Sequence, residues 1–151
     1  MDLRMSAEDR EEFLAGLHVG ILGVDDPRDG GGPLLVPLWY SYQPGGPVTI
    51  ATGRQSLKAR LIRGAGRFSL CVQDESAPYR YVSVEGPVVD VEDPLPRAEQ
   101  EALAHRYLDA ETATAYLAAN QGQLADDVLI RMRPERWRTA DFSAFAEEFE
   151  S

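Results

Sequence analysis

The chain has 151 residues, of which 44% are hydrophobic and 26% charged, a balance typical of a folded domain rather than a disordered chain. We expect one domain over residues 1–151. The net charge of −10 argues against nucleic acid as a partner, because phosphate backbones require a broad basic surface. No apolar run approaches the ~20 residues that cross a bilayer, and no secretory signal is recognisable. We therefore expect a cytoplasmic protein without a membrane partner.

The apolar pattern predicts a mainly β domain with flanking helices. The expected helices cover 7–16, 56–64, 97–108 and 111–120, and the expected strands cover 18–24, 33–42, 48–52, 67–73, 79–91 and 128–139. Gly86-Pro87 predicts a bulge or bend in the long fifth strand, and Pro134 interrupts the sixth. Six strands with few helices favour a small closed barrel. The acidic tail, about 140–151, contains Phe142, Phe145 and Phe149 and predicts a short amphipathic helix.

Two single features limit the chemistry. Cys71 is the only cysteine, which excludes an intramolecular disulfide and a cysteine-based zinc site. Its apolar neighbours predict a buried strand residue rather than a nucleophile. His18 and His105 are isolated in the sequence, so we assign no catalytic residue and no metal site.

The second strand, 33–42, is apolar on both faces. Leu34, Val36 and Leu38 alternate with Leu35 and other apolar residues, so both sides of the strand must be covered. A barrel interior on one side and a partner chain on the other would satisfy this requirement.

The segment that carries most functional information is 52–60, where an apolar strand meets a basic helix. No acidic residue occurs between Asp29 and Asp74, and this stretch has charge +5, against −15 for the remainder. Gly53 allows the sharp turn, Ser56 is a helix cap, and Lys58 is the only lysine of the chain. A helix start with free amides and an ammonium group nearby is typical of a phosphate site. The alternative is an ordinary solvated basic face of a surface helix.

Several runs in the same order resemble the pyridoxamine 5'-phosphate oxidase-like superfamily, the FMN-binding split barrels, and especially its actinobacterial flavin- and deazaflavin-dependent branch. The matching runs are Val36-Pro37-Leu38-Trp39-Tyr40, Thr52-Gly53 with Ser56-Leu57-Lys58-Ala59-Arg60, 67–72, 78–86, and 133–137 ahead of 141–143. The resemblance implies a six-stranded split β-barrel and a homodimer with two cofactor sites at the subunit interface. The cofactor would be coenzyme F-420 or FMN.

The resemblance also assigns residues to the cofactor. Its phosphate would be held by Thr52, Gly53, Ser56, Lys58 and Arg54 or Arg60. The ring system would lie along the backbone of Val36, Pro37, Leu38 and Trp39. Tyr79 and Arg80 would approach from the partner chain.

The function implied is that of a flavoprotein oxidoreductase, an F-420- or FMN-dependent reductase of a conjugated small molecule. Hydride transfer of this kind requires proximity and water exclusion more than a side-chain acid or base. Two alternatives remain: a non-catalytic module that binds or stores flavin or haem, and a structural dimer with a vestigial site. Pyridoxamine phosphate oxidation itself is less favoured, because the expected Arg and His have no clear counterpart in Arg136-Trp137-Arg138-Thr139.

Overall fold

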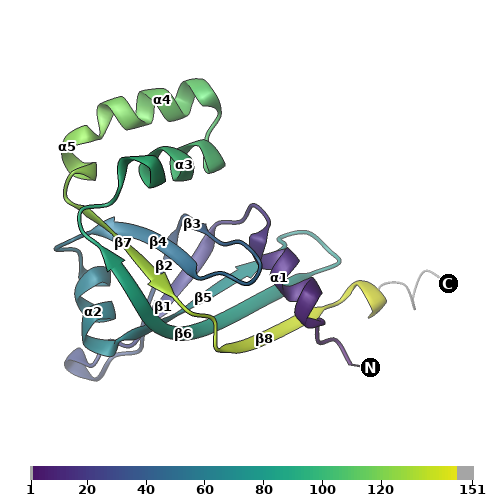
Figure 1. The fold of residues 1–151 in the computed structure, drawn as a ribbon. Coiled ribbons are helices and arrows are strands. Elements are labelled where there is room, and N and C mark those ends of the chain that lie inside the picture. Colours follow the sequence, from purple (N-terminus) through teal and green to yellow (C-terminus); the bar gives the residue numbers. More distant parts are fainter. Residues whose placement is uncertain (1, 146–151) are drawn as a thin grey trace.

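The computed structural model describes residues 2–145, which form a strongly curled antiparallel sheet with helices at its ends and over one side (Figure 1). In the described part of the chain, the strands are β1 (Gly20–Val24), β2 (Leu34–Leu38), β3 (Tyr40–Ser41), β4 (Val48–Gly53), β5 (Arg67–Gln73), β6 (Arg80–Glu92), β7 (Asp127–Met132) and β8 (Arg136–Asp141). The helices are α1 (Ala7–Ala15), a 3-10 turn η1 (Arg28–Gly30), α2 (Leu57–Ala65), α3 (Arg97–Tyr107), α4 (Ala110–Ala119) and α5 (Gln121–Leu124).

The sheet curls until its two ends share one stretch of chain. The strand order is β2-β1-β5-β6-β7-β4-β3, with β8 paired to β6 outside this path. β2 and β3 lie at opposite ends of that order, yet only Trp39 separates them in sequence. The covalent chain at Trp39 therefore joins the two ends of the sheet. The sequence pattern did not reveal that the strand is interrupted at Trp39.

The long strand β6 divides its pairing between two groups of strands. Its first half pairs with β5 and β8, and its second half pairs with β7 after a register shift between Val88 and Asp90. At Gly86 the chain that links β7 to β8 crosses so closely that a Cβ there would lie 1.7 Å from the backbone oxygen of Arg133. The predicted irregularity of β6 is confirmed, and Gly86 is the residue that permits the crossing.

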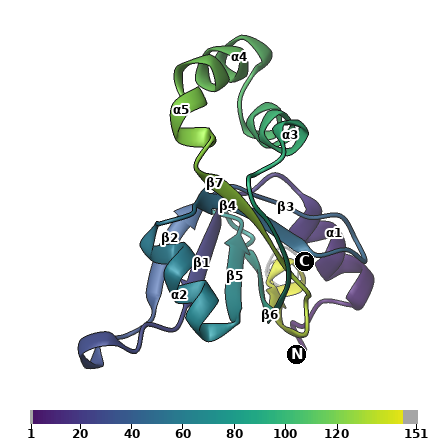
Figure 2. The same ribbon diagram turned by 60° about the vertical axis from the view of Figure 1, so that its left-hand side comes forward.

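The hairpin of α3, α4 and α5 is inserted between β6 and β7 and stands away from the barrel (Figures 1 and 2). Tyr107 fastens it to the body, since its hydroxyl donates to the backbone oxygen of His18 at 2.6 Å and accepts from the backbone N–H of Tyr40 at 3.1 Å. Arg106 adds a hydrogen bond of 2.7 Å to the backbone oxygen of Gly16.

The core lies inside the curl of the sheet. Its fully buried members include Leu14 from α1, Tyr40, Ile50 from β4, Leu70 from β5 and Met132 from β7. Alternate residues of the strands supply them, as expected for strands with one buried face. The Tyr40 hydroxyl donates to the backbone oxygen of Leu14 at 2.6 Å, so this buried polar group is satisfied.

The predicted mainly β architecture is confirmed, but the predicted number of six strands was too low. Trp39 divides the predicted strand 33–42 into β2 and β3, and Pro134, which cannot donate to a ladder, separates β7 from β8. The four predicted α-helices occur close to their expected bounds, and α5 was missed. The predicted tail helix falls largely at 146–151, outside the described residues; of its aromatics, Phe142 and Phe145 are exposed. No helix among residues 2–145 combines the length and apolarity required to span a bilayer.

Candidate functional site

The junction of β4 and α2 forms a compact polar corner. Thr52 is buried near the end of β4, and its Oγ1 lies 2.9 Å from Oγ of Ser56. Ser56 is the N-cap of α2, where its Oγ accepts from the backbone N–H of Ala59 at 3.1 Å. The first-turn amides of Leu57 and Lys58 have no carbonyl of their own helix to bond, which leaves donors for an anion.

A carboxylate that sequence patterns did not single out also faces this corner. Asp127, the first residue of β7, is paired with Gly53 across the β4–β7 ladder. A Cβ placed on Gly53 would lie 3.8 Å from Oδ1 of Asp127 and 3.8 Å from Cβ of Ser56. Burial raises the pKa of the Asp127 carboxyl, as does neighbouring Asp126, while Lys58 and Arg54 oppose the rise in this pKa. The corner therefore combines hydroxyls, an ammonium group and a partly buried acid.

The arginines of the motif differ in their surroundings. Arg54 forms ion pairs with Asp93 and Asp126, and its side chain is turned to this acidic neighbourhood. Its backbone oxygen accepts from Arg63 at 2.8 Å, which fixes the turn after β4. Arg60 lies one turn into α2 with its side chain exposed. Of the predicted phosphate ligands, Thr52, Ser56 and Lys58 therefore lie together, Arg54 is already paired, and Arg60 lies at the periphery.

The segment 36–39 approaches the same corner from the side. Within the described chain β2 pairs only with β1, so its other edge presents unpaired backbone groups. Val36 and Leu38 pack on the core, and Pro37 points outward. Trp39 lines a cavity of about 140 Å³, the Trp39 cavity, together with Ala51 and Asp127. Trp39 thus comes close to the strand end that carries the motif.

Two aromatic residues of the inserted hairpin contact Trp39, and one of them, Tyr116, also lines the Trp39 cavity. The rings of Trp39 and Tyr107 are stacked, with centroids 5.1 Å apart and an interplanar angle of 6°, and Tyr116 lies 5.5 Å away. Neither tyrosine was predicted to belong to the site. The sequence shows only that both tyrosines belong to a helical stretch. This predicts that they pack against something, but it does not predict which strand the helices cover.

Tyr79 and Arg80 lie elsewhere in the same chain. Both are exposed at the start of β6, where Arg80 donates to Asp74 at 2.7 Å and stacks over the Phe13 ring at 4.8 Å. Figure 1 places the start of β6 on the far side of the molecule from α2. A single chain therefore does not bring these two residues to the β4–α2 corner.

The outer face of β1 and β2 is apolar and open. Leu35 is 66% exposed and Ile21 is 40% exposed, and Ile21 is paired with both Pro37 and Cys71. Leu17 and Val19 extend this surface. We call these six residues the β1–β2 face. Cys71 lies in a strand as predicted, but it is half-buried rather than buried, because its side of β5 continues the open face. Partial burial still raises the pKa of the Cys71 thiol, which does not favour a reactive thiolate.

Comparisons with known structures support the fold assignment. The structure resembles the conserved hypothetical protein Rv2991 from Mycobacterium tuberculosis, with a TM-score of 0.73 and 24% identity over 96% of this chain and 90% of that one. It also resembles an F420 reductase, with a TM-score of 0.61 and 24% identity over 85% of this chain and 94% of that one. A FAD-binding protein from Mesorhizobium loti gives a TM-score of 0.60 and 23% identity over 92% of this chain and 96% of that one.

Sequence comparison identifies the family. No curated protein sequence matches the chain at a significant level. A family model described as pyridoxamine 5'-phosphate oxidase matches residues 7–141, which include every strand and the β4–α2 corner. The chain therefore belongs to the pyridoxamine 5'-phosphate oxidase family.

Proposed function

We propose that this protein binds a phosphate-bearing flavin or deazaflavin, FMN or coenzyme F-420, and acts with it as an oxidoreductase. The observation that carries the proposal is the β4–α2 corner, where two hydroxyls lie 2.9 Å apart at a helix N-terminus, and where Lys58 of the first helical turn acts electrostatically on Asp127. These groups fit a phosphate, because amides, hydroxyls and an ammonium group all donate to anionic oxygens. Names of similar proteins, an F420 reductase and a FAD-binding protein, point to the same cofactor class.

In this proposal each part of the site has a physical task. Thr52, Ser56 and Lys58 hold the phosphate, the open edge of β2 lies along the ring system, and Trp39 helps to exclude water. The bound cofactor supplies hydride transfer to a conjugated small molecule. The chain's own contribution is binding, orientation and exclusion of water, which together account for a large part of such catalysis.

The same proposal requires a second copy of the chain. The β1–β2 face offers apolar surface next to the strand that would carry the ring, and an uncovered apolar face of this kind is typical of an interface. In a homodimer, the partner's Tyr79 and the partner's Arg80 would complete the site. Their distance from the corner within one chain agrees with this arrangement.

Titration of the purified protein with FMN and with F-420 tests cofactor binding. We expect Lys58→Ala to weaken binding by about 1 to 3 kcal/mol, the contribution of a charge-assisted hydrogen bond. Arg97→Ala is the matched control, because it removes one positive charge from the exposed surface of α3. An unchanged dissociation constant in Lys58→Ala would remove the phosphate assignment, and failure of both ligands to bind would remove the proposed function.

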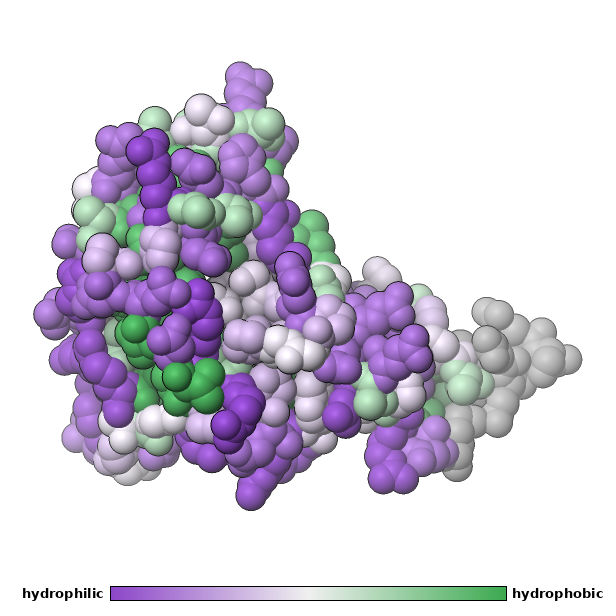
Figure 3. Space-filling view, viewed as in Figure 1, coloured by the Kyte–Doolittle hydropathy of each residue, from purple (hydrophilic) through white to green (hydrophobic). Residues whose placement is uncertain are grey.

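Two further measurements separate the remaining alternatives. Turnover of enones, quinones or tetrapyrroles with reduced cofactor supports the oxidoreductase, whereas tight binding without turnover favours a cofactor-binding or storage protein. Light scattering of Leu35→Glu tests the dimer, since a charge in a buried apolar interface should shift the protein to monomer. Val91→Glu is the control and should leave the mass unchanged. Val91 is also half exposed, but it lies on the second half of β6, outside the β1–β2 face, and the apolar groups on the face drawn in Figure 3 are small and set among hydrophilic residues.

A further inference from the structure

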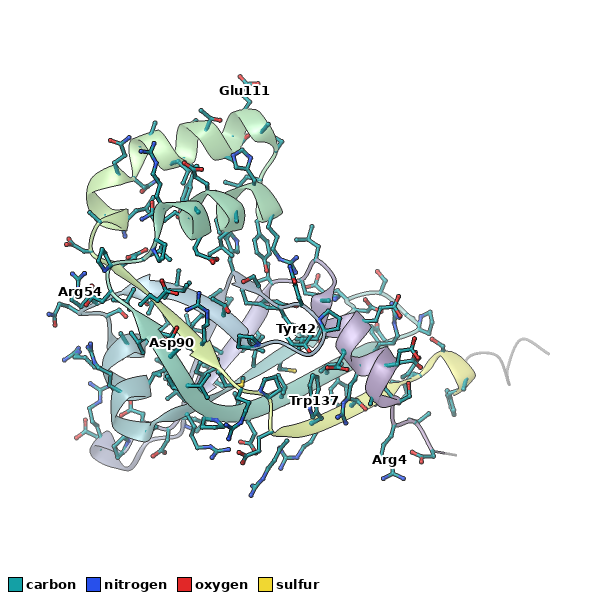
Figure 4. All side chains as sticks on the ribbon, in the orientation of Figure 1. Arg4, Tyr42, Arg54, Asp90, Glu111 and Trp137 are labelled. Atoms are coloured by element: carbon teal, nitrogen blue, oxygen red, sulfur yellow. The ribbon has the colours of Figure 1, made fainter. Side chains whose placement is uncertain are left out.

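A second cavity of about 480 Å³, here the Arg10 cavity, lies at the other end of β4 from the proposed phosphate corner. Its lining includes Arg10 and Glu11 of α1, Tyr42 and the turn before β4, and Trp137 of β8. Figure 4 shows Tyr42 and Trp137 near each other towards the middle of the molecule, away from Arg54 at its edge. A strand of six residues separates the two places, about 20 Å, so they are distinct sites in one chain.

Arg10 brings a positive charge into this cavity without a negative partner. Its guanidinium lies over the Trp137 ring, 4.5 Å from the centroid, and its Nε is buried with no hydrogen-bond partner. Among residues 2–145, no carboxylate forms an ion pair with Arg10, whereas most other arginines in this part of the chain have one. A partly buried cation without a counter-charge is costly, and an anionic ligand would remove that cost.

The adjacent carboxylate is committed to other donors. Glu11 Oε1 accepts from the Tyr42 hydroxyl at 3.0 Å and from the Gly45 backbone N–H at 3.0 Å. These bonds hold the turn before β4 against α1. Burial, helped by the hydrogen bond that the Tyr42 hydroxyl donates to Glu11, raises the pKa of Tyr42 to about 12, so the phenol stays neutral. Glu11 therefore shapes the cavity and does not neutralise Arg10.

The remaining walls are apolar, with a second guanidinium beside them. Val89, Pro47, Pro134 and Trp137 contribute apolar surface. Arg133 also lines the cavity; its side chain is 65% exposed, and its pairing with Glu135 is loose, at 3.9 Å. Two guanidinium groups and one engaged carboxylate leave the lining with net positive charge. The volume is in the range of small-molecule sites, which combine apolar walls with a few fixed polar groups.

We propose that the Arg10 cavity binds a small organic anion with a flat apolar body, an aromatic carboxylate in chemical class. The carboxylate pairs with Arg10 and, more weakly, with Arg133, and the apolar body lies against Pro134, Val89 and the edge of Trp137. This site is independent of the proposed phosphate corner and takes a different ligand.

The probe is 2-naphthoate, with 2-naphthamide as a neutral ligand of the same shape. Both are titrated into the ¹⁵N-labelled protein while the two tryptophan indole N–H signals and the arginine Nε–H signals are followed. In the unmodified protein, we expect saturable naphthoate binding with Kd of about 1 mM or tighter and a preference over the amide of about tenfold or more. The signals that shift should be those of Trp137 and Arg10, not that of Trp39.

Variants then test which arginine pairs with the carboxylate of the ligand. Arg10→Gln should abolish the preference for the carboxylate, Arg10→Lys should retain part of it, and Arg133→Gln should lower it less. Arg4→Gln is the control, because Arg4 is exposed before α1 and paired with Asp2, and it should bind naphthoate as the unmodified protein does. FMN and F-420 titrations of Arg10→Gln should be unchanged, which separates this site from the cofactor site.

Three results would overturn the proposal: equal binding of acid and amide, no saturable binding, or a shift confined to the Trp39 indole. Retention of the full preference in a folded Arg10→Gln variant would overturn it as well. If Arg10→Gln does not fold, the preference of the unmodified protein, the identity of the shifted indole and the Arg133→Gln variant still decide the question.

Discussion

The Oγ1 of Thr52 and the Oγ of Ser56 lie 2.9 Å apart, one at the end of β4 and the other at the cap of α2. The contact joins a strand end to a helix start across a turn of three residues. One hydroxyl donates its hydrogen to the other, which leaves one hydroxyl hydrogen for an anion placed over the helix N-terminus, beside the free amides of α2.

Removal of the Ser56 hydroxyl should affect both stability and cofactor binding, and two variants distinguish the two effects. Ser56→Ala loses the cap bond to Ala59 and should lower the free energy of unfolding by about 1 kcal/mol, whereas Ser56→Gly should cost only a few tenths. Both variants should weaken cofactor binding, because both lack the hydroxyl. Urea denaturation and cofactor titration measure the two effects, and equal stabilities for the two variants would contradict the capping role.

Cofactor binding should become tighter as the pH falls, through Asp127. Burial raises the folded-state pKa of this carboxyl, so protonation is easier in the corner than in water, and an incoming phosphate would raise this pKa further. Affinity should therefore rise as the pH is lowered from about 7 to about 5, towards the ordinary range of an Asp carboxyl. FMN or F-420 titrations across this range give the dependence.

The Asp127→Asn variant isolates this effect from titration of the FMN phosphate itself, which has a second pKa of about 6. It should bind the cofactor more tightly than the unmodified protein at about pH 7 and show a flatter pH profile. Identical profiles for the two proteins would exclude Asp127 as the titrating group.

Tyr107 should contribute measurably to the attachment of the inserted hairpin. Tyr107→Phe removes the bond to His18 at 2.6 Å and leaves the Tyr40 N–H without its acceptor. We expect a loss of about 1 to 3 kcal/mol in the free energy of unfolding and a change in Trp39 fluorescence, since the two rings are stacked. Tyr81→Phe, at an exposed position of β6, should change neither quantity.

Two glycine-to-alanine substitutions should change the free energy of unfolding in opposite directions. Gly86→Ala places a methyl group 1.7 Å from the Arg133 backbone oxygen and should destabilise the fold by about 3 kcal/mol or more. Gly64→Ala lies in α2 with no atom within 4 Å of the added Cβ and should stabilise the protein by about 0.5 to 1 kcal/mol. Thermal or urea unfolding of both variants tests whether the room for the added methyl group decides if the substitution stabilises or destabilises the protein.

The sequence by itself determined where most helices and strands lie, because these elements depend mainly on residues that are neighbours in the chain. Ser56 marked the start of α2, Pro134 marked the interruption of the predicted strand 128–139, and the apolar pattern placed a strand at 67–73, the observed bounds of β5. Gly53, predicted to allow the turn, lies in β4 without a positive φ. The composition of segment 52–60 identified the place where an anion would bind. The order of the motifs also identified the family, which the match over residues 7–141 confirmed.

Only the tertiary structure decided which distant residues meet. Asp127 reaches the corner because β7 pairs with β4, and Tyr107 stacks on Trp39 because the inserted hairpin packs over the point where the sheet closes. Arg10 stands over Trp137 because α1 packs against β8. Such contacts join residues separated by 68 to 127 positions in the chain, so they follow from strand register and helix packing, which no local pattern encodes.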